Sequence, residues 1–186
     1  MLPVLMRPAG RNAETSIKIQ DDMKRFTRQK AETLHALVKT VKQRIENINT
    51  GGCGVLAYYL SEFLAMKGYP SQIICLDGEF DRYDTEHQSN MRAIADRDKK
   101  SSFVYDHFGL KVGDYFIDAN ILTRSADIPN IYGHLKPLGT MSRSDLKFLI
   151  SLDDKWNHRY DRSQNDHMKK LLYGIVCRFS REVKTA

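Results

Sequence analysis

Apolar residues recur along the chain with two different periods, and these periods separate its expected helices from its expected strands. Between Asp21 and Ile48 they stand three or four residues apart, which predicts an amphipathic helix with one buried stripe. The stripe consists of Leu34, Leu37, Val38, Val41, Ile45 and Ile48. The same period returns from Cys53 to Lys67, where a length of about four turns predicts a central, buried helix.

Shorter apolar runs predict the strands. Residues 72–76 are rich in β-branched side chains and lie between turn-forming residues, which indicates a buried strand. Residues 103–112 and 115–119 form two further runs, separated only by Gly113-Asp114. A Gly-Asp pair in this position predicts a two-residue β-hairpin.

The remaining segments complete the predicted organisation. Residues 1–16 read as an N-terminal arm and residues 17–186 as a single domain. The highly charged segment 77–102 is expected to be a loop with a helical turn or two over 90–98, and residues 121–140 are expected to be irregular. Short C-terminal helices should follow capping boxes that begin at Ser142, Ser151 and Ser163, the last helix covering 164–179. The predicted fold class is α+β: a central helix on a small antiparallel sheet, with N- and C-terminal helices.

Composition excludes several functions. The chain has 186 residues and a net charge of +6, but its basic residues follow no aromatic or zinc-finger pattern, so we do not expect nucleic acid as its partner. Three widely spaced cysteines argue for a reducing compartment, and without a leader or a long apolar segment we expect a cytoplasmic protein that binds no membrane. Spaced metal-ligand motifs are absent, so neither a metal nor a cofactor is expected.

The strongest chemical signal is Cys53 within Gly51-Gly52-Cys53-Gly54, at the start of the predicted central helix. A helix N-terminus favours the thiolate, because its unpaired N–H groups and its dipole attract negative charge. The competing interpretation is a glycine turn that caps the helix and carries an incidental thiol. Cys75 and Cys177 lie inside apolar runs, which indicates packing residues.

The predicted hairpin supplies a base and a carboxylate. If Gly113-Asp114 is its turn, Asp118 projects on the same face as His107, at the distance of diagonal neighbours. Cys53, His107 and Asp118 would then form a nucleophile, a base and an orienting residue. Asn120 is an alternative orienting residue.

These residues resemble the papain-like cysteine hydrolases and, within them, the transglutaminase-like superfamily, including small phage and bacterial members. The resemblance implies a thiol hydrolase acting on an amide or peptide bond of a protein or peptide substrate, most simply a cysteine peptidase. It also implies an oxyanion-binding side chain shortly before the cysteine, at Asn49 or Asn47. Transglutaminase or acyltransferase activity remains open, as does a non-catalytic interaction module on the same fold.

Overall fold

A computed structural model describes residues 25–48, 51–81, 102–128, 135–152 and 160–185, together with residues 96 and 99. The expected N-terminal arm lies outside these residues, as does nearly all of the helical segment expected at 90–98. In chain order the elements are α2 (Arg28–Lys39), η1 (Thr40–Gln43), α3 (Cys53–Met66), β1 (Gln72–Asp81), β2 (Ser102–Val112), β3 (Tyr115–Ile117), β4 (Leu122–Arg124), η2 (Ser125–Asp127), β5 (Leu135–Met141), α6 (Arg143–Leu152), η4 (Arg162–Gln164) and α7 (Asn165–Thr185).

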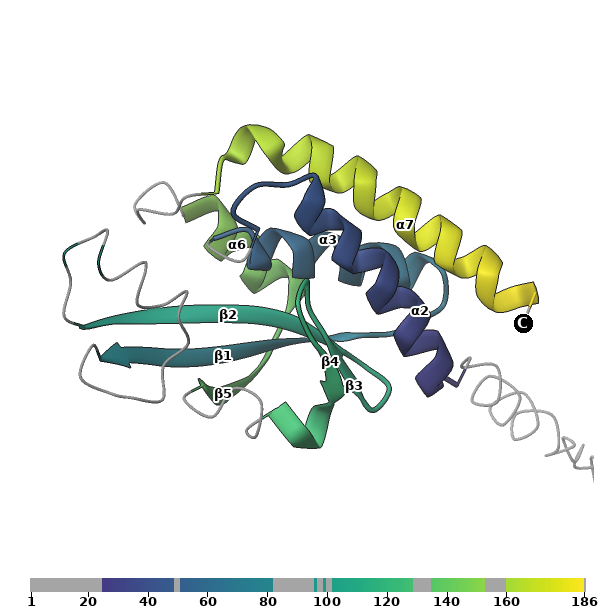
Figure 1. Ribbon diagram of the computed structural model, residues 1–186, viewed down its shortest axis with the longest axis horizontal. Helices are drawn as coiled ribbons and strands as arrows, with labels where there is room; N and C mark the ends of the chain where they lie inside the picture. Colours follow the sequence, from purple (N-terminus) through teal and green to yellow (C-terminus); the bar gives the residue numbers. More distant parts are fainter. Residues whose placement is uncertain are drawn as a thin grey trace, which may run out of the picture.

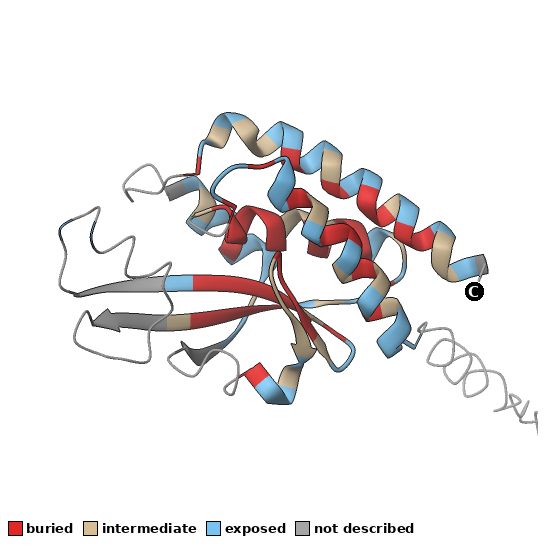
Figure 2. Cartoon of the chain, in the orientation of Figure 1, coloured by how far each residue is buried: buried red, intermediate tan, exposed pale blue. Residues whose placement is uncertain are grey.

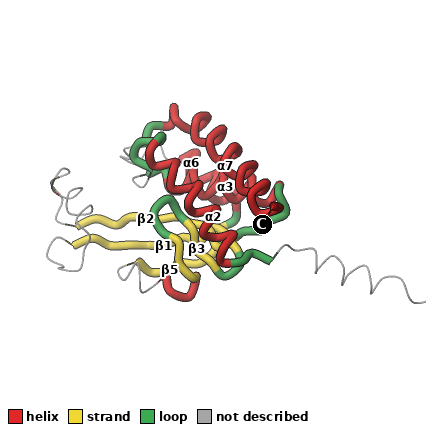
Figure 3. The backbone as a smooth tube through the Cα atoms, turned by 45° about the vertical axis from the view of Figure 1, so that its right-hand side comes forward, coloured by secondary structure: helices red, strands yellow, loops and turns green. Residues whose placement is uncertain are grey.

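The strands form one five-stranded antiparallel sheet in the order β4-β3-β2-β1-β5. The α-helices of the described residues, α2, α3, α6 and α7, lie together on one face of this sheet, so this part of the chain forms a helical layer and a β layer (Figure 1). The tube view from a different angle shows the same two layers (Figure 3). The α+β class and the small antiparallel sheet were therefore predicted correctly.

The main hydrophobic core lies between the two layers. The inward surfaces of the helices and the middle of β1 and β2 are buried (Figure 2). A second, smaller cluster covers part of the opposite face of the sheet and consists of Ile74, Leu76, Phe116 and Ile128. Because both faces are covered there, the centre of the sheet is shielded from water on both sides.

The N-terminal helix has the predicted buried stripe but is shorter than predicted. All six stripe residues are buried. Thr27 caps the start of α2 by accepting a hydrogen bond from the Lys30 backbone N–H. The α-helix ends at Lys39, continues as η1, and gives way to a turn in which Asn47 has a φ of 55°. The last two stripe residues, Ile45 and Ile48, therefore lie in the turn that follows η1 rather than on a regular helix.

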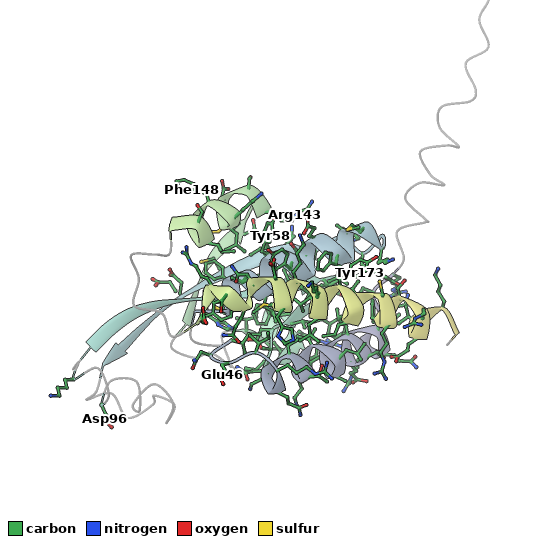
Figure 4. All side chains as sticks on the ribbon, turned by 90° about the horizontal axis from the view of Figure 1, so that it is seen from above. Glu46, Tyr58, Asp96, Arg143, Phe148 and Tyr173 are labelled. Atoms are coloured by element: carbon green, nitrogen blue, oxygen red, sulfur yellow. The ribbon has the colours of Figure 1, made fainter. Side chains whose placement is uncertain are left out.

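The C-terminal helices differ in detail from the predicted ones. Viewed from the helical side, α7 lies between α2 and the pair α3 and α6 (Figure 4). The Ser142 capping box is present, because the Ser142 hydroxyl accepts a hydrogen bond from the Asp145 N–H at 3.1 Å. The box predicted at Ser151 is wrong, since Ser151 lies inside α6 and donates to a backbone carbonyl. At the third position Asp161, not Ser163, caps the helical turn η4, and α7 extends to Thr185.

Two strand predictions were also wrong. Residues 77–81 continue β1 instead of starting a loop, because they pair with residues 102–106 of β2. The segment 121–140 contains β4 and all of β5 except its last residue, Met141, although it was expected to be irregular. Strand β5 is at the edge of the sheet, which is where a strand tolerates a proline such as Pro137. No helix among the described residues has both the length and the apolar composition needed to span a bilayer.

Candidate active site

Cys53 is the first residue of α3, as predicted. The helix has Gly52 at its N-cap and no side chain caps it. Its first intrahelical hydrogen bond runs from the Leu56 N–H to the Gly52 carbonyl at 3.0 Å. The N–H groups of the first turn therefore point out of the helix end beside the Cys53 sulfur, where they favour negative charge.

The glycines around Cys53 have separate structural reasons. Gly51 has a φ of 106°, a conformation that L side chains rarely adopt. At Gly52 a Cβ atom would lie 2.8 Å from the backbone Cα of Ile48 and 2.8 Å from the Tyr160 ring. At Gly54 the nearest atoms would be 3.5 Å away, an ordinary contact. The backbone conformation and packing before Cys53 therefore require glycine at positions 51 and 52. Position 54 has room for a larger side chain.

The β2–β3 hairpin has the predicted register. Val112 pairs with Tyr115 and Leu110 with Ile117 around the turn at Gly113, whose φ is 58°. Strand β3 ends at Ile117, so the part of β2 that precedes Leu110 lies beside a turn formed by residues 118–121. Asp118 and His107 meet at this end of the hairpin.

Asp118 holds His107 through a short hydrogen bond. The His107 Nε2 atom lies 2.7 Å from Asp118 Oδ2. The other carboxylate oxygen, Oδ1, accepts the backbone N–H groups of Asn120 and Ile121, each at 2.6 Å. Asp118 is completely buried. A buried carboxylate with this many donors is ionised and fixed in orientation, which fixes the imidazole in turn.

His107 also contacts the cysteine. A hydrogen bond joins its side chain to Cys53, and since Nε2 is occupied by Asp118, Nδ1 is the atom left to face the sulfur. Burial alone lowers the pKa of His107. The hydrogen bonds to Asp118 and Cys53, together with the electrostatic interactions with these two groups, outweigh burial and raise this pKa to about 10. The structure therefore brings together all three residues predicted from the sequence, and it holds the imidazole in its protonated form at neutral pH.

The three predicted auxiliary asparagines occupy different places. The side-chain oxygen of Asn120 accepts a hydrogen bond from the Lys42 ammonium, so its amide is directed to η1 while its backbone N–H binds Asp118. Asn47 is exposed in the turn that leads towards Cys53. Asn49 lies outside the described residues. Both candidates for an oxyanion-binding side chain therefore remain predictions.

The other cysteines are placed differently from Cys53. Cys75 is buried on β1, and burial, followed by the nearby charges of Asp106 and Asp77, raises its thiol pKa to about 11. Its assignment as a packing residue is confirmed. Cys177 is half-buried on α7. Neither occupies a helix N-terminus.

Two residues near the site were missed in the sequence. Burial lowers the pKa of His35 on α2, an effect that the charge of Asp118 opposes, and Lys42 on η1 binds the Asn120 side chain. His35 follows a stripe position, Leu34, and a histidine beside an apolar stripe is the signal that could have indicated a buried role. Among the described residues, no three His, Cys, Asp or Glu side chains are grouped so as to hold a metal ion. Comparison with protein-family models, curated proteins and solved structures yields no match.

Proposed function

We propose that this protein is a thiol hydrolase of the papain-like or transglutaminase-like type, which cleaves an amide or peptide bond through Cys53, His107 and Asp118. The observation that carries the proposal is the buried hydrogen-bonded series Cys53–His107–Asp118, with a 2.7 Å bond between the histidine and the carboxylate. The order of residues along the chain and their placement on a helix, a strand and the end of the next strand agree with that type of enzyme.

The raised pKa of His107 supports this chemistry more strongly than the proximity of His107 to Cys53 alone would. A protonated imidazole beside Cys53 stabilises a thiolate, which is the nucleophilic form of cysteine. The uncapped N-terminus of α3 adds to the stabilisation, because its dipole and its N–H groups act on the same sulfur. A cysteine that only packs in the core requires neither a protonated histidine nor a helix N-terminus beside its sulfur.

The reaction begins when the Cys53 thiolate attacks the substrate carbonyl carbon. The carbonyl π electrons move to oxygen, and the resulting oxyanion is bound by backbone N–H groups at the start of α3. The intermediate collapses, the carbon–nitrogen bond breaks, and the leaving amine takes a proton from His107. A water molecule then attacks the acyl-thioester and gives its proton to His107, and collapse releases a carboxylic acid and restores the thiolate.

Alkylation by iodoacetamide tests the proposal, with mass spectrometry used to follow each cysteine separately. At pH 6 the folded protein should be labelled at Cys53 well before Cys75 or Cys177, because Cys53 is hydrogen-bonded to His107, whose pKa is raised. The urea-unfolded chain provides the control, since all three thiols are equivalent there. Labelling of Cys53 at pH 6 that is no faster in the folded than in the unfolded chain would remove it as a nucleophile.

A second measurement separates hydrolysis from acyl transfer. Peptide substrates are incubated with the protein with and without an added primary amine, and the Cys53→Ser variant serves as the matched control. Hydrolysis releases a free carboxylic acid in both cases, whereas an acyltransferase gives mainly the amide of the added amine. We expect hydrolysis, because the reaction then needs no second substrate site. Wild type could give no more product than Cys53→Ser on any substrate while Cys53 still reacts rapidly with iodoacetamide. In that case the protein is better described as a non-catalytic interaction module with a reactive thiol.

A further inference from the structure

A groove lies between α7 and the segment that contains the end of α2 and η1. It has a volume of about 540 Å³. The α7 residues that line it are spaced three or four apart, so the groove follows one face of that helix over about three turns. They are His167, Lys170, Leu171, Gly174, Ile175 and Arg178. On the other side of the groove, α2 lies alongside α7 (Figure 4).

The charged side chains that line the groove are basic. Arg44 directly follows η1, and Lys170 and Arg178 lie on α7; we call these three exposed residues the basic cluster. The lining residues include no aspartate or glutamate. Arg178 forms an ion pair with Glu182 at 2.7 Å, whereas no other described residue forms an ion pair with Arg44 or Lys170. The groove therefore presents positive charge that the described part of the chain leaves largely uncompensated.

Gly174 lines the groove although nothing in the described structure requires a glycine there. It lies in the middle of α7, where glycine destabilises a helix relative to almost any other residue. It does not have a positive φ, and a Cβ atom built on it would meet no atom within 4 Å. The missing side chain thus leaves room for the backbone of another molecule to approach α7 closely.

The shape and chemistry of the groove fit a helical peptide. Its flanking elements are helices, whose backbone groups are hydrogen-bonded internally, so they offer no strand edge with which an extended peptide could pair. A helix satisfies its own backbone groups and can place apolar side chains against Leu37, Leu171 and Ile175. Single-stranded nucleic acid fits less well, because no aromatic residue lines the groove to stack on a base.

We propose that this groove binds an acidic amphipathic helix of a partner protein. The apolar face of the helix lies over Gly174, and its carboxylates meet the basic cluster. None of the lining residues is Cys53, His107 or Asp118, so the proposal does not depend on the proposed hydrolase activity.

Fluorescence anisotropy tests the proposal with a labelled peptide of about five helical turns, which has leucine along one face and glutamate on the others. One control peptide has glutamine in place of every glutamate, and a second has the same composition in scrambled order. All measurements use the full chain with Cys53→Ser, so that turnover of the peptide cannot contribute. We expect saturable binding of the acidic amphipathic peptide that weakens as the salt concentration rises, and much weaker binding of both control peptides.

Substitutions locate the binding surface. An exposed charge pair changes an equilibrium by a factor of about 2 to 5, so Lys170→Glu, which removes one attraction and adds one repulsion, should weaken binding by about 4- to 25-fold. Lys147→Glu is the matched control, because Lys147 is an exposed lysine on α6; it should stay within about 2-fold of the parent. Gly174→Gln should weaken binding by about 5-fold or more while it raises the melting temperature, because glutamine favours a helix and fills the groove. A residue that serves only the fold would not show these opposite effects.

Several results would overturn the proposal: no saturable binding of the acidic peptide up to about 1 mM, equal binding of the glutamine peptide, or unchanged binding by Gly174→Gln. Tighter binding of single-stranded oligothymidine that Lys170→Glu abolishes would assign the groove to nucleic acid instead. If a variant fails to fold by circular dichroism, nitrogen-15 NMR of the chain with its groove unaltered decides. The acidic peptide must then shift the amide resonances of Lys170 and Gly174, and shifts confined to other surfaces would contradict the proposal.

Discussion

Replacing Asp118 by asparagine is the most informative single change at this site, because it alters one atom that faces His107 and preserves the rest of the turn. The amide oxygen of the new side chain can still accept the two N–H groups that Oδ1 accepts at 2.6 Å. The amide nitrogen, however, replaces the oxygen that lies 2.7 Å from His107 Nε2. Two donors would then face each other, so His107 must lose its Nε2 proton.

The consequence for Cys53 follows from this loss. With Nε2 unprotonated, Nδ1 carries the only proton of the neutral ring and can no longer accept one from the thiol. The negative charge of Asp118 is also gone, so the pKa of His107 falls from its value of about 10. A hydrogen bond between charged groups contributes about 1.5–3 kcal/mol. That range corresponds to alkylation of Cys53 that is slower by a factor between about 10 and about 160 at pH 6. Turnover should fall further, by on the order of 10⁴-fold, as in other triads in which the tautomer is inverted.

The assay is the pH profile of Cys53 alkylation in wild type and Asp118→Asn, with folding checked by circular dichroism. Asp114→Asn is the matched control, because Asp114 is an exposed aspartate in the hairpin turn. The control should follow the wild-type profile. Superimposable profiles for wild type and Asp118→Asn would refute the reasoning and reduce Asp118 to a residue that organises its own turn.

Three further predictions concern the packing and the electrostatics around the site. Gly109→Ala should lower the free energy of unfolding by about 1–3 kcal/mol in urea, since its Cβ would lie 2.2 Å from the fully buried ring of Phe116; a Phe116→Leu background should relieve most of this loss. Gly52→Ala should lower the melting temperature because its Cβ would meet backbone atoms at 2.8 Å, whereas Gly54→Ala should leave it unchanged or raise it, and the reverse order would contradict the packing described. Because the pKa of His107 is raised to about 10, its stabilising contribution is complete below about pH 6.5 and declines as the pH rises towards 10, by no more than about 1.4 kcal/mol per pH unit. Urea unfolding of wild type and His107→Gln should therefore show a smaller stability difference at pH 9 than at pH 6, and a constant difference would contradict the raised pKa.

The parts of the site that could be predicted are those encoded over short distances. The helix that begins at Cys53 was predicted from the helical spacing of its apolar residues and from the glycine pair that precedes it. The proximity of His107 to Asp118 was predicted from the strand register that a two-residue hairpin turn imposes. Both are local patterns, in which a few neighbouring residues decide the backbone.

The parts that could not be predicted depend on partners that are distant in sequence. Strand β1 extends to Asp81 because β2 is there to pair with it, although residues 77–81 include three acidic residues and a glycine. Strand β5 contains Pro137, which a strand tolerates at the edge of a sheet. No local sequence pattern reveals that β5 is an edge strand. The hydrogen bond between Lys42 and the Asn120 side chain likewise exists only after the N-terminal helical segment has packed beside the hairpin. In each case tertiary context overrides local preference.

The separation of the three site residues along the chain has a consequence for when the thiol becomes reactive during folding. His107 and Asp118 are 11 residues apart on one hairpin, so they can meet as soon as that hairpin forms. Cys53 belongs to a different element, and the longer loop that joins it to the hairpin must close at a greater entropic cost. The base and its carboxylate can therefore form before the nucleophile arrives. A partly folded chain would then carry Cys53 without its histidine partner, and we expect its alkylation to become faster only when α3 docks on the sheet.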